Sequence, residues 1–230
     1  TIIEAVRVGE VDEGVTPIEN SLEGAVVDTL DLLIEENTLQ IKQEIMVPIL
    51  HCLLIKPDTL AKDINTIYSH PQALGQCRRF LEHNYPNAQL LPSLSTAAAV
   101  EQMQSSDSPA AAIASQRAGD LYGAKVLEAD IQDQPGNTTR FVVWAQEDHA
   151  PTGHDKTSIC FDFDEAQGTR VGETPGLLYE VISEFAKRGI SMAKIESRPA
   201  KREMGRYFFL VDLLGHRQDV ALGEALENIR

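Results

Sequence analysis

Polar residues follow the ends of several apolar runs in the first part of the chain. They form the short stretches Glu19-Asn20-Ser21, Ser69-His70-Pro71-Gln72, Ser95-Thr96 and Ser115. Ser and Asn side chains at such positions accept hydrogen bonds from the first N–H groups of a helix. Helix N-termini also carry partial positive charge, so several of them at one crevice attract an anionic small molecule. We therefore expect an anion site that includes Asn20, Ser21, Gln72, Ser95 and Thr96.

A further polar segment, Asn137-Thr138-Thr139-Arg140-Phe141, runs into an apolar stretch. The planar guanidinium of Arg140 suits a carboxylate, and two hydroxyls stand beside it. His70 is an acid–base candidate by residue type, but its place before Pro71 favours a helix cap. Glu19 is interpreted as a structural hydrogen-bond acceptor. The segment at 137–141 therefore predicts a guanidinium and a hydroxyl donor at the edge of the anion site.

The elements that would position these residues follow from the order of apolar runs. Short β-type runs alternate with helical-period runs, which is typical of an α/β domain with a largely parallel sheet. Strands are expected at 14–18, 66–69, 89–91, 110–114 and 141–144, with a helix after each of the first four. The turns that follow parallel strands meet at the carboxyl edge of the sheet, where ligands bind.

Two crossing segments indicate that this region has two lobes. The apolar run at 45–55, with Pro48 in its middle, is interpreted as one strand that crosses between the lobes. Ile131-Gln132-Asp133 is interpreted as the chain crossing back. The expected arrangement resembles that of periplasmic binding proteins, with a cleft between the lobes.

A polar stretch at 146–155 predicts a linker, which separates a region at 1–146 from one at 156–230. The second region begins with an alternating strand from Lys156. Thr174-Pro175 is expected to start a helix and Gly189 to end it. Two more strands and a last helix from near Gln218 give the order β-α-β-β-α. This order matches a ferredoxin-like βαββαβ unit without its final strand, so the C-terminus is interpreted as cut.

Composition excludes several classes of function. The 230 residues carry 35 acidic against 20 basic side chains, a net charge of −15. Such a field repels a phosphate backbone, so nucleic acid is not expected as a partner. The longest apolar run is far shorter than the roughly 18 residues of a membrane span. The three cysteines, Cys52, Cys77 and Cys160, lie far apart in apolar surroundings, which favours reduced core thiols and a cytoplasmic protein.

Beyond these general patterns, the chain carries specific motifs in a fixed order. In the first region they are Pro17-Ile-Glu-Asn-Ser-Leu-Glu-Gly24, His70-Pro-Gln-Ala-Leu74 with Gln76-Cys77, Ser95-Thr-Ala97, Tyr122-Gly123, Ile131-Gln-Asp133 and Asn137-Thr-Thr-Arg-Phe141. This set resembles the prephenate dehydratase family. After the linker they are Pro175-Gly176, Phe185-Ala186, Arg188-Gly189-Ile190, Lys194-Ile-Glu-Ser-Arg-Pro199 and Gly205-Arg-Tyr207. This second set resembles the ACT regulatory domain attached to that enzyme.

The resemblance implies that prephenate is converted to phenylpyruvate with loss of water and carbon dioxide, a step of phenylalanine biosynthesis. It implies an active site in the cleft between the lobes, with no cofactor and no metal. The essential threonine of that family precedes Arg-Phe, which is Thr139 here, and it is expected to bond to the leaving hydroxyl. We expect Arg140 and the turns at Asn20-Ser21 and Ser95-Thr96 to bind the carboxylates, with Gln72 orienting the substrate.

The resemblance also implies feedback inhibition by phenylalanine through the ACT domain. The regulatory ligand is expected at two segments, formed by Pro175, Gly176, Leu177, Leu178, Glu196, Ser197, Arg198 and Pro199. Ferredoxin-like units of this kind commonly pair and hold ligands at the shared interface, so a homodimer or homotetramer is expected.

Two departures from the family pattern bear on these expectations. The family begins with a strand and a glycine-rich turn that line the cleft, and this sequence starts downstream of both. A protein made only of these residues is therefore expected to be inactive. In the ACT region the sequence has Gly176-Leu177-Leu178 where the family often has Gly-Ala-Leu. The larger side chain of Leu177 is expected to narrow the phenylalanine pocket.

Two other functions remain open from the sequence. An arogenate dehydratase would keep nearly every motif, because arogenate differs from prephenate only by an amine in place of the side-chain keto group. A non-enzymatic amino-acid sensor would need the cleft but no donor for a leaving group, and Thr139 argues against it.

Overall fold

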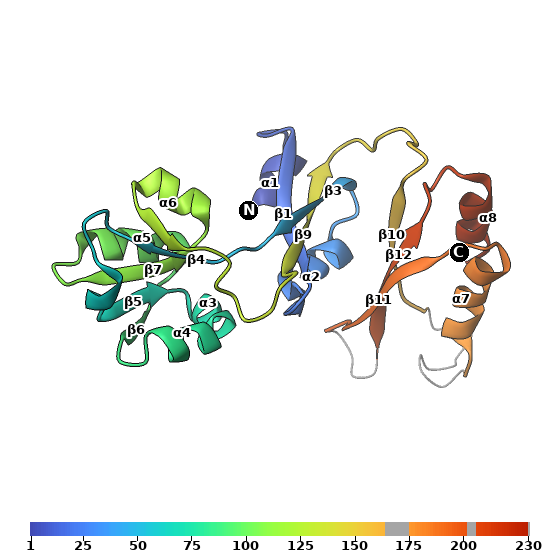
Figure 1. The fold of residues 1–230 in the computed structure, drawn as a ribbon. Coiled ribbons are helices and arrows are strands. Elements are labelled where there is room, and N and C mark those ends of the chain that lie inside the picture. Colours follow the sequence, from blue (N-terminus) through green and yellow to red (C-terminus); the bar gives the residue numbers. More distant parts are fainter. Residues whose placement is uncertain (164–174, 202–205, 230) are drawn as a thin grey trace. The chain divides into compact units, whose positions relative to one another are not determined.

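The computed structural model describes residues 1–163, 175–201 and 206–229 (Figure 1). The chain folds into two compact units. Unit 1 comprises Thr1–Ile45 with Arg140–Arg230, and unit 2 comprises Met46–Thr139. The chain thus leaves unit 1 once and returns once. The two crossing points lie at 45/46 and 139/140, not at the expected 131–133, which falls inside unit 2.

The first part of unit 1 is built on a four-stranded sheet in the order β2-β1-β9-β3. Its strands are β1 (Glu13–Asn20), β2 (Gly24–Ala25), β3 (Gln40–Pro48) and β9 (Thr138–Ala145), and its helices are α1 (Ile2–Arg7) and α2 (Val27–Glu35). Its core includes Ile18, Leu30 and Trp144. The indole N–H of Trp144 donates to the Thr16 hydroxyl at 2.8 Å. This buried hydrogen bond satisfies the one polar group of the largest core side chain.

Helix α2 begins later than the apolar spacing predicts. Leu22 lies in a turn, and the short strand β2 pairs antiparallel with the end of β1 before the helix starts at Val27. The helix has Val26 at its N-cap, without a side-chain hydrogen bond. The expected helix directly after Asn20-Ser21 is therefore wrong, because a strand pairing takes up the residues between.

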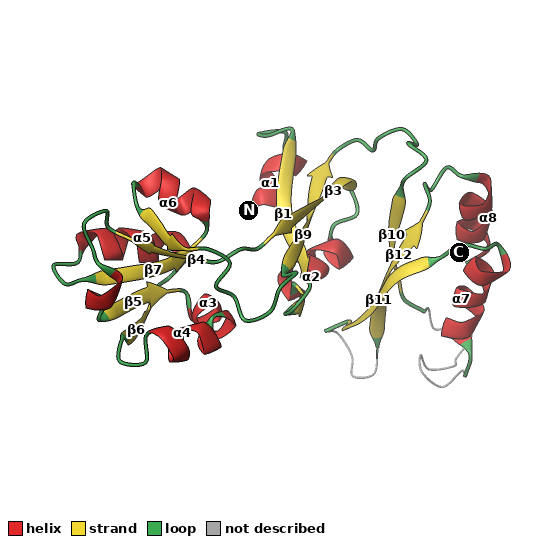
Figure 2. Ribbon diagram, in the orientation of Figure 1, coloured by secondary structure: helices red, strands yellow, loops and turns green. Residues whose placement is uncertain are grey.

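Unit 2 is built on a five-stranded sheet in the order β6-β5-β7-β4-β8, flanked by helices (Figure 2). The strands are β4 (Cys52–Ile55), β5 (Thr66–Ser69), β6 (Gln89–Pro92), β7 (Ala110–Ala114) and β8 (Lys125–Glu128). The helices are α3 (Pro71–Gln76), α4 (Arg78–Asn84), α5 (Thr96–Ser105) and α6 (Gln116–Tyr122), with a 3₁₀ turn η1 (Ala61–Asp63). Every residue of β4 and β7 is buried. A sheet covered on both faces explains why these strands are continuously apolar.

The five-stranded sheet is mixed rather than largely parallel. Strand β5 pairs parallel with β6 and with β7, as expected. Strand β4 pairs antiparallel with both β7 and β8. The chain passes from β4 to β5, the next strand of this sheet along the chain, through the 3₁₀ turn η1 and without the helical crossover that a parallel connection requires.

The apolar run at 45–55 forms two strands instead of one. Strand β3 ends at Pro48 in unit 1's sheet, and β4 begins at Cys52 in unit 2's sheet. Pro48 has no N–H to continue a ladder, which explains the break at this point. The prediction that this run crosses between two units is nevertheless confirmed.

The last part of unit 1 has the order β10 (Lys156–Phe161), α7 (Leu177–Lys187), β11 (Met192–Pro199), β12 (Tyr207–Leu214) and α8 (Val220–Asn228). It confirms the expected β-α-β-β-α order over the described residues. The strands form an antiparallel three-stranded sheet in the order β10-β12-β11. Val211 and Leu213 of β12 pack in one core with Phe185 of α7 and Leu222 of α8. Both helices thus cover one face of this sheet.

The start of α7 differs from the sequence prediction. Gly176 is its N-cap, with φ of 97° and no side-chain cap. Thr174, the predicted cap, lies outside the described residues. Pro175 precedes the cap instead of occupying the first turn.

The three cysteines are free thiols, and two of them lie in the core. Cys52 and Cys77 are buried, whereas Cys160 is exposed, so its assignment to the core is wrong. Burial raises the pKa of Cys77 to about 12, which keeps that thiol protonated and unreactive. In the described part of the chain, no helix combines the length and the apolar character that crossing a membrane requires.

Candidate functional site

The predicted turns of unit 2 gather at one edge of its sheet. The parallel register places Ser69 opposite Pro92, and Tyr68 opposite both Leu91 and Ala112. The carboxyl ends of β5, β6 and β7 therefore coincide, and α3, α5 and α6 start there. Gln72 and Thr96 lie in the first turns of α3 and α5, and Ser95 is the N-cap of α5, so the fold brings all three to a common edge.

The caps of these helices are formed by the side chains that the sequence indicated. The hydroxyl of Ser95 accepts from the Ala98 N–H at 3.0 Å, and the hydroxyl of Ser115 accepts from the Ala118 N–H at 3.2 Å. The Nδ1 atom of His70 accepts from the Gln72 N–H at 3.3 Å. His70 therefore serves as a helix cap, as its position before a proline predicts.

A buried polar network at the same edge holds the segment that leads to Thr139. The Oε1 atom of Gln76 accepts from Asn137 Nδ2 at 3.2 Å and lies 2.8 Å from His51 Nε2. The backbone adds a bond from the Ile49 N–H to the Asn137 carbonyl at 2.8 Å. Since His51 and Asn137 are both buried, these bonds fix the backbone just before Thr138 and Thr139.

Sequence reasoning did not single out His51 or Gln76 as site residues. In the sequence, Gln76 belongs to the Gln76-Cys77 motif, and His51 interrupts the apolar run at 45–55. That interruption was the available signal, because a histidine beside a continuously buried strand needs a hydrogen-bond partner.

Asn20 and Ser21 lie in unit 1, at the turn between β1 and β2. The Asn20 Oδ1 atom accepts from the N–H groups of Leu22 and Glu23 at 2.9 and 3.0 Å. This is a turn closed by an asparagine side chain and not the capped end of a helix, so no helix dipole acts here. The expected capped helix end at Asn20-Ser21 is therefore wrong, whereas the assignment of these two residues to the substrate stays a prediction.

Arg140 is the most heavily paired residue among the predicted site residues. Its guanidinium lies 2.8 Å from Asp212, 3.1 Å from Glu19 and 3.2 Å from Glu44. The side chain is 9% exposed and that of Asp212 is 8% exposed. In this structure the guanidinium is neutralised by three carboxylates of the chain itself, which disfavours the predicted contact with a substrate carboxylate.

Two lysines complete what we call the Arg140 ion cluster, which consists of Glu19, Glu44, Arg140, Lys156, Lys194 and Asp212. Lys156 lies 2.8 Å from Glu44, and Lys194 lies 3.3 Å from Glu19. Three cations and three carboxylates balance in formal charge. The cluster joins strands of the four-stranded sheet to strands of the three-stranded sheet, both within unit 1.

Two members of this cluster, Glu44 and Arg140, have pKa values that are shifted toward their charged forms. Burial by itself would raise the pKa of Glu44, but Lys156 and Arg140 outweigh it and hold that pKa below its usual range. Burial would likewise lower the pKa of Arg140, and Asp212 outweighs it, so the pKa of Arg140 is raised. Glu44 and Arg140 therefore both favour their charged forms in the folded protein.

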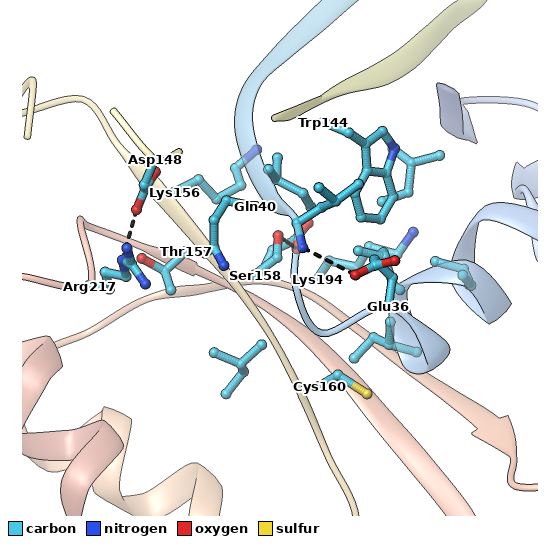
Figure 3. A pocket seen from close by; sticks show the side chains of 18 of the residues that line it. Glu36, Gln40, Trp144, Asp148, Lys156, Thr157, Ser158, Cys160, Lys194 and Arg217 are labelled. Atoms are coloured by element: carbon cyan, nitrogen blue, oxygen red, sulfur yellow. Dashed lines mark hydrogen bonds and ion pairs between the residues drawn. The ribbon is translucent and has the colours of Figure 1, made fainter. Parts of the chain in front are cut away.

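A cavity of about 280 Å³ lies beside this cluster within unit 1 (Figure 3). Its apolar lining includes Leu30, Trp144 and Leu210. Asp148 and Arg217 also line the cavity. They form an ion pair of 2.7 Å, which is drawn as a dashed line (Figure 3). Each lysine and arginine that lines the cavity in the described part of the chain has an acidic partner. The cavity therefore offers no uncompensated positive charge to a dianion.

The two predicted regulatory segments lie on α7 and β11. Pro175, Gly176, Leu177 and Leu178 form the start of α7, and Glu196, Ser197, Arg198 and Pro199 form the end of β11. Arg198 donates to Asp31 of α2 at 2.9 Å, and Lys201 binds the other oxygen of Asp31. One predicted ligand residue is thus engaged by the first part of unit 1.

Family comparisons agree with these motifs and with this architecture. A family model described as prephenate dehydratase matches residues 1–149, and one described as the ACT domain matches residues 169–230. The chain belongs to the prephenate dehydratase family. The expected two-part fold, a binding-protein-like dehydratase region followed by a ferredoxin-like ACT domain, is confirmed.

Individual relatives show the extent of the similarity. A bifunctional chorismate mutase/prephenate dehydratase of Aquifex aeolicus is 42% identical over 95% of this chain and 58% of its own length. A prephenate dehydratase of Mycolicibacterium vanbaalenii is 36% identical over 97% of this chain and 70% of its own length. The chain spans about three fifths of the bifunctional relatives.

The solved structures agree. A prephenate dehydratase of Arthrobacter aurescens in complex with L-Phe has a TM-score of 0.85 and 37% identity. The match covers 99% of this chain and 73% of that one.

Proposed function

We propose that this protein is a prephenate dehydratase that forms phenylpyruvate and is feedback-inhibited by phenylalanine through its ACT domain. The observation that carries the proposal is the match of the dehydratase family model over residues 1–149, with Thr139, Arg140 and Phe141 at the family's T-R-F motif. The polar network that holds Asn137 supports it, because it fixes the backbone that presents Thr139.

The reaction needs little covalent help from the protein. The bond between the ring and its carboxylate breaks, and its electron pair forms a ring double bond as carbon dioxide leaves. The 4-hydroxyl takes up a proton that comes ultimately from the solvent and departs as water, and aromatisation of the ring drives both steps. Catalysis then depends on positioning and on a hydrogen-bond donor at the departing oxygen.

Thr139 is the donor in this proposal. Its hydroxyl donates a hydrogen bond to the 4-hydroxyl of prephenate. This hydrogen bond becomes stronger as negative charge develops on the leaving oxygen. Gln72, Ser95 and Thr96, at the edge of the unit 2 sheet, bind polar groups of the substrate, and the family resemblance assigns the same task to Asn20 and Ser21.

Arg140 has a different role in this proposal from the one its residue type predicts. Its guanidinium forms ion pairs with Glu19, Glu44 and Asp212, so we assign it to holding β9 next to Thr139 instead of binding a substrate charge. Removing Arg140 would leave the buried carboxylate of Asp212 without its cation, whereas Glu44 and Glu19 would keep Lys156 and Lys194.

Substitution of Thr139 tests the proposed reaction in the full-length protein. We expect Thr139→Ala to lower kcat about 100-fold or more, because a transition-state hydrogen bond is lost. Thr139→Ser keeps the hydroxyl and should retain much of the activity. Thr138→Ala, the matched control one residue away, should change kcat less than about tenfold. Phenylpyruvate is measured by its absorbance in alkali.

The same assay separates the alternatives. Turnover of arogenate to phenylalanine in preference to prephenate would make the protein an arogenate dehydratase. Absence of turnover with either substrate, together with binding of an amino acid, would favour a non-enzymatic sensor. Equal loss in the Thr138→Ala and Thr139→Ala variants would contradict the specific role of Thr139.

The regulatory part of the proposal follows the Phe-bound structure of the relative from Arthrobacter aurescens. We assign phenylalanine to the segments at 175–178 and 196–199, in a homodimer or homotetramer formed through the ACT domains. Sedimentation and turnover measured with and without phenylalanine test this assignment. No change in either quantity at saturating phenylalanine would contradict it.

A further inference from the structure

The ACT domain makes direct ionic contact with the strands of the dehydratase region. Asp212 of β12 binds Arg140 of β9 at 2.8 Å, and Lys156 of β10 binds Glu44 of β3 at 2.8 Å. In the four-stranded sheet β9 and β3 are neighbours. Two separate ACT strands therefore hold two adjacent strands of the dehydratase region.

Those two dehydratase strands are the ones on which the chain passes between the units. Arg140 is the first residue of unit 1 after the chain returns from unit 2, and it directly follows Thr139. Glu44 lies one residue before the end of the first segment of unit 1, Ile45. The Arg140 ion cluster thus sits at both crossing points.

On the ACT side, the cluster lies on one face of the three-stranded sheet. The register places Ser158 and Lys194 on either side of Asp212. The Ser158 hydroxyl donates to the second oxygen of Asp212 at 2.6 Å. The neighbours Val211 and Leu213 pack under α7 and α8 on the opposite face. A shift of those helices therefore reaches Asp212 through the residues beside it in the same strand.

We propose that the pairs Asp212–Arg140 and Lys156–Glu44 couple the ACT domain to the active site, so that phenylalanine bound by the ACT domain alters the placement of Thr139. This inference rests on the proposed function and names the residues through which its regulation acts. Both Arg140 and Asp212 are more than nine-tenths buried, so their ion pair is shielded from water. A buried ion pair is suited to this task because partial separation of its charges is costly, whereas an exposed pair can loosen freely.

The test uses Asp212→Asn in the full-length protein, which removes the charge and keeps the size of the side chain. At a phenylalanine concentration that slows the wild type about tenfold, we expect the variant to be slowed less than about twofold. Binding of phenylalanine, measured by calorimetry, should persist within about threefold in affinity. The matched control is Glu184→Gln, which breaks pairs with Lys187 and Arg188 on α7, away from the cluster. It should be inhibited as the wild type is.

A second variant keeps the proposal testable if Asp212→Asn fails to fold. Lys156→Gln removes the second ion pair, Lys156–Glu44, in which the lysine is half-buried. This variant should also show weaker inhibition while phenylalanine still binds. Full inhibition in both variants would overturn the proposal. So would loss of phenylalanine binding, since the residues would then belong to the ligand site. Loss of turnover in a folded variant without phenylalanine would overturn it too, since Asp212 would then serve basal catalysis.

These outcomes are distinct from failure of the proposed function. If the wild type does not act on prephenate, or if Thr139→Ala has no effect, the proposed function fails. If those tests succeed and Asp212→Asn remains fully inhibited, only the coupling role fails.

Discussion

At the scale of single residues, the Arg140 guanidinium has the chemistry to bind a substrate carboxylate but pairs with carboxylates of the chain itself. Its shape suits a substrate carboxylate, and the sequence places it next to the threonine of the T-R-F motif. In the fold, however, Glu19, Glu44 and Asp212 arrive from three different strands and neutralise it. Local sequence reveals the charge of a side chain, but not which distant residues will compensate it.

Glu44 gives this cluster a predictable dependence on pH. Its pKa is lowered in the folded protein below the ordinary value of 4.5. A carboxyl group with a depressed folded pKa stabilises the fold fully above its unfolded pKa, and this contribution is lost as the pH falls through the folded pKa. We expect the stability difference between the wild type and Glu44→Gln to be constant from pH 7 to about pH 5 and to shrink below about 4.5. Urea unfolding at several pH values measures it.

The direction in which this stability difference changes with pH shows in which direction the pKa of Glu44 is shifted. A difference between wild type and Glu44→Gln that stays the same down to pH 3 would show that the Glu44 carboxylate is not stabilised by Lys156 and Arg140. A difference that grows in acid would indicate the opposite shift of pKa.

At the scale of elements, local signals were reliable where a helix is closed by its own residues. Ser95 and Ser115 cap α5 and α6 as their positions predict, because a cap bond spans only three residues. The predicted start of α2 is wrong, because the two residues of β2 pair with β1 and the helix begins only after them. Short strand pairings of this kind depend on the neighbouring strand and leave little trace in the local sequence.

The contact of α1 with β1 leads to a prediction at this scale. Gly14 lies in β1 against α1, and a Cβ added there would lie 2.5 Å from Ile2 Cγ2 and 2.9 Å from Val6 Cγ2. We expect Gly14→Ala to lower the free energy of unfolding by about 1–3 kcal/mol, because the helix must shift away from the strand. Chemical denaturation measures this change.

Gly75 provides the control for this prediction. It lies within α3, and an added Cβ would meet nothing within 4 Å. Because alanine favours a helix over glycine, Gly75→Ala should be neutral or stabilising by up to about 1 kcal/mol. Equal destabilisation by both substitutions would contradict the close packing of α1 on β1.

At the scale of the whole molecule, the two units have separate cores. The core of unit 1 around Trp144 includes Ile18 and Leu30, whereas the core of unit 2 on one face of its sheet includes Val100 and Met103. Since the chain has a single tryptophan, fluorescence of Trp144 reports on unit 1. Far-UV circular dichroism reports on both units. Separate cores allow the units to lose structure independently.

Met103→Ala tests this independence. Met103 is fully buried in unit 2, and its truncation should destabilise that unit by about 2–5 kcal/mol. We expect the transition seen by circular dichroism to broaden toward lower denaturant, while the transition of Trp144 fluorescence stays in place. A shift of both transitions by the same amount would show that the units unfold as one.

The sequence alone determined the family, the alternation of elements and the residues at the strand ends. These features depend on interactions within a few residues, such as the cap formed by Ser95, or on the order of motifs along the chain. The tertiary structure alone decided that the 45–55 run is divided between two sheets, that β4 runs antiparallel to its neighbours, and that Arg140 binds Asp212. The physical reason is that strand pairing and charge compensation are chosen among residues far apart in sequence, and only the packed fold brings a particular pair within reach.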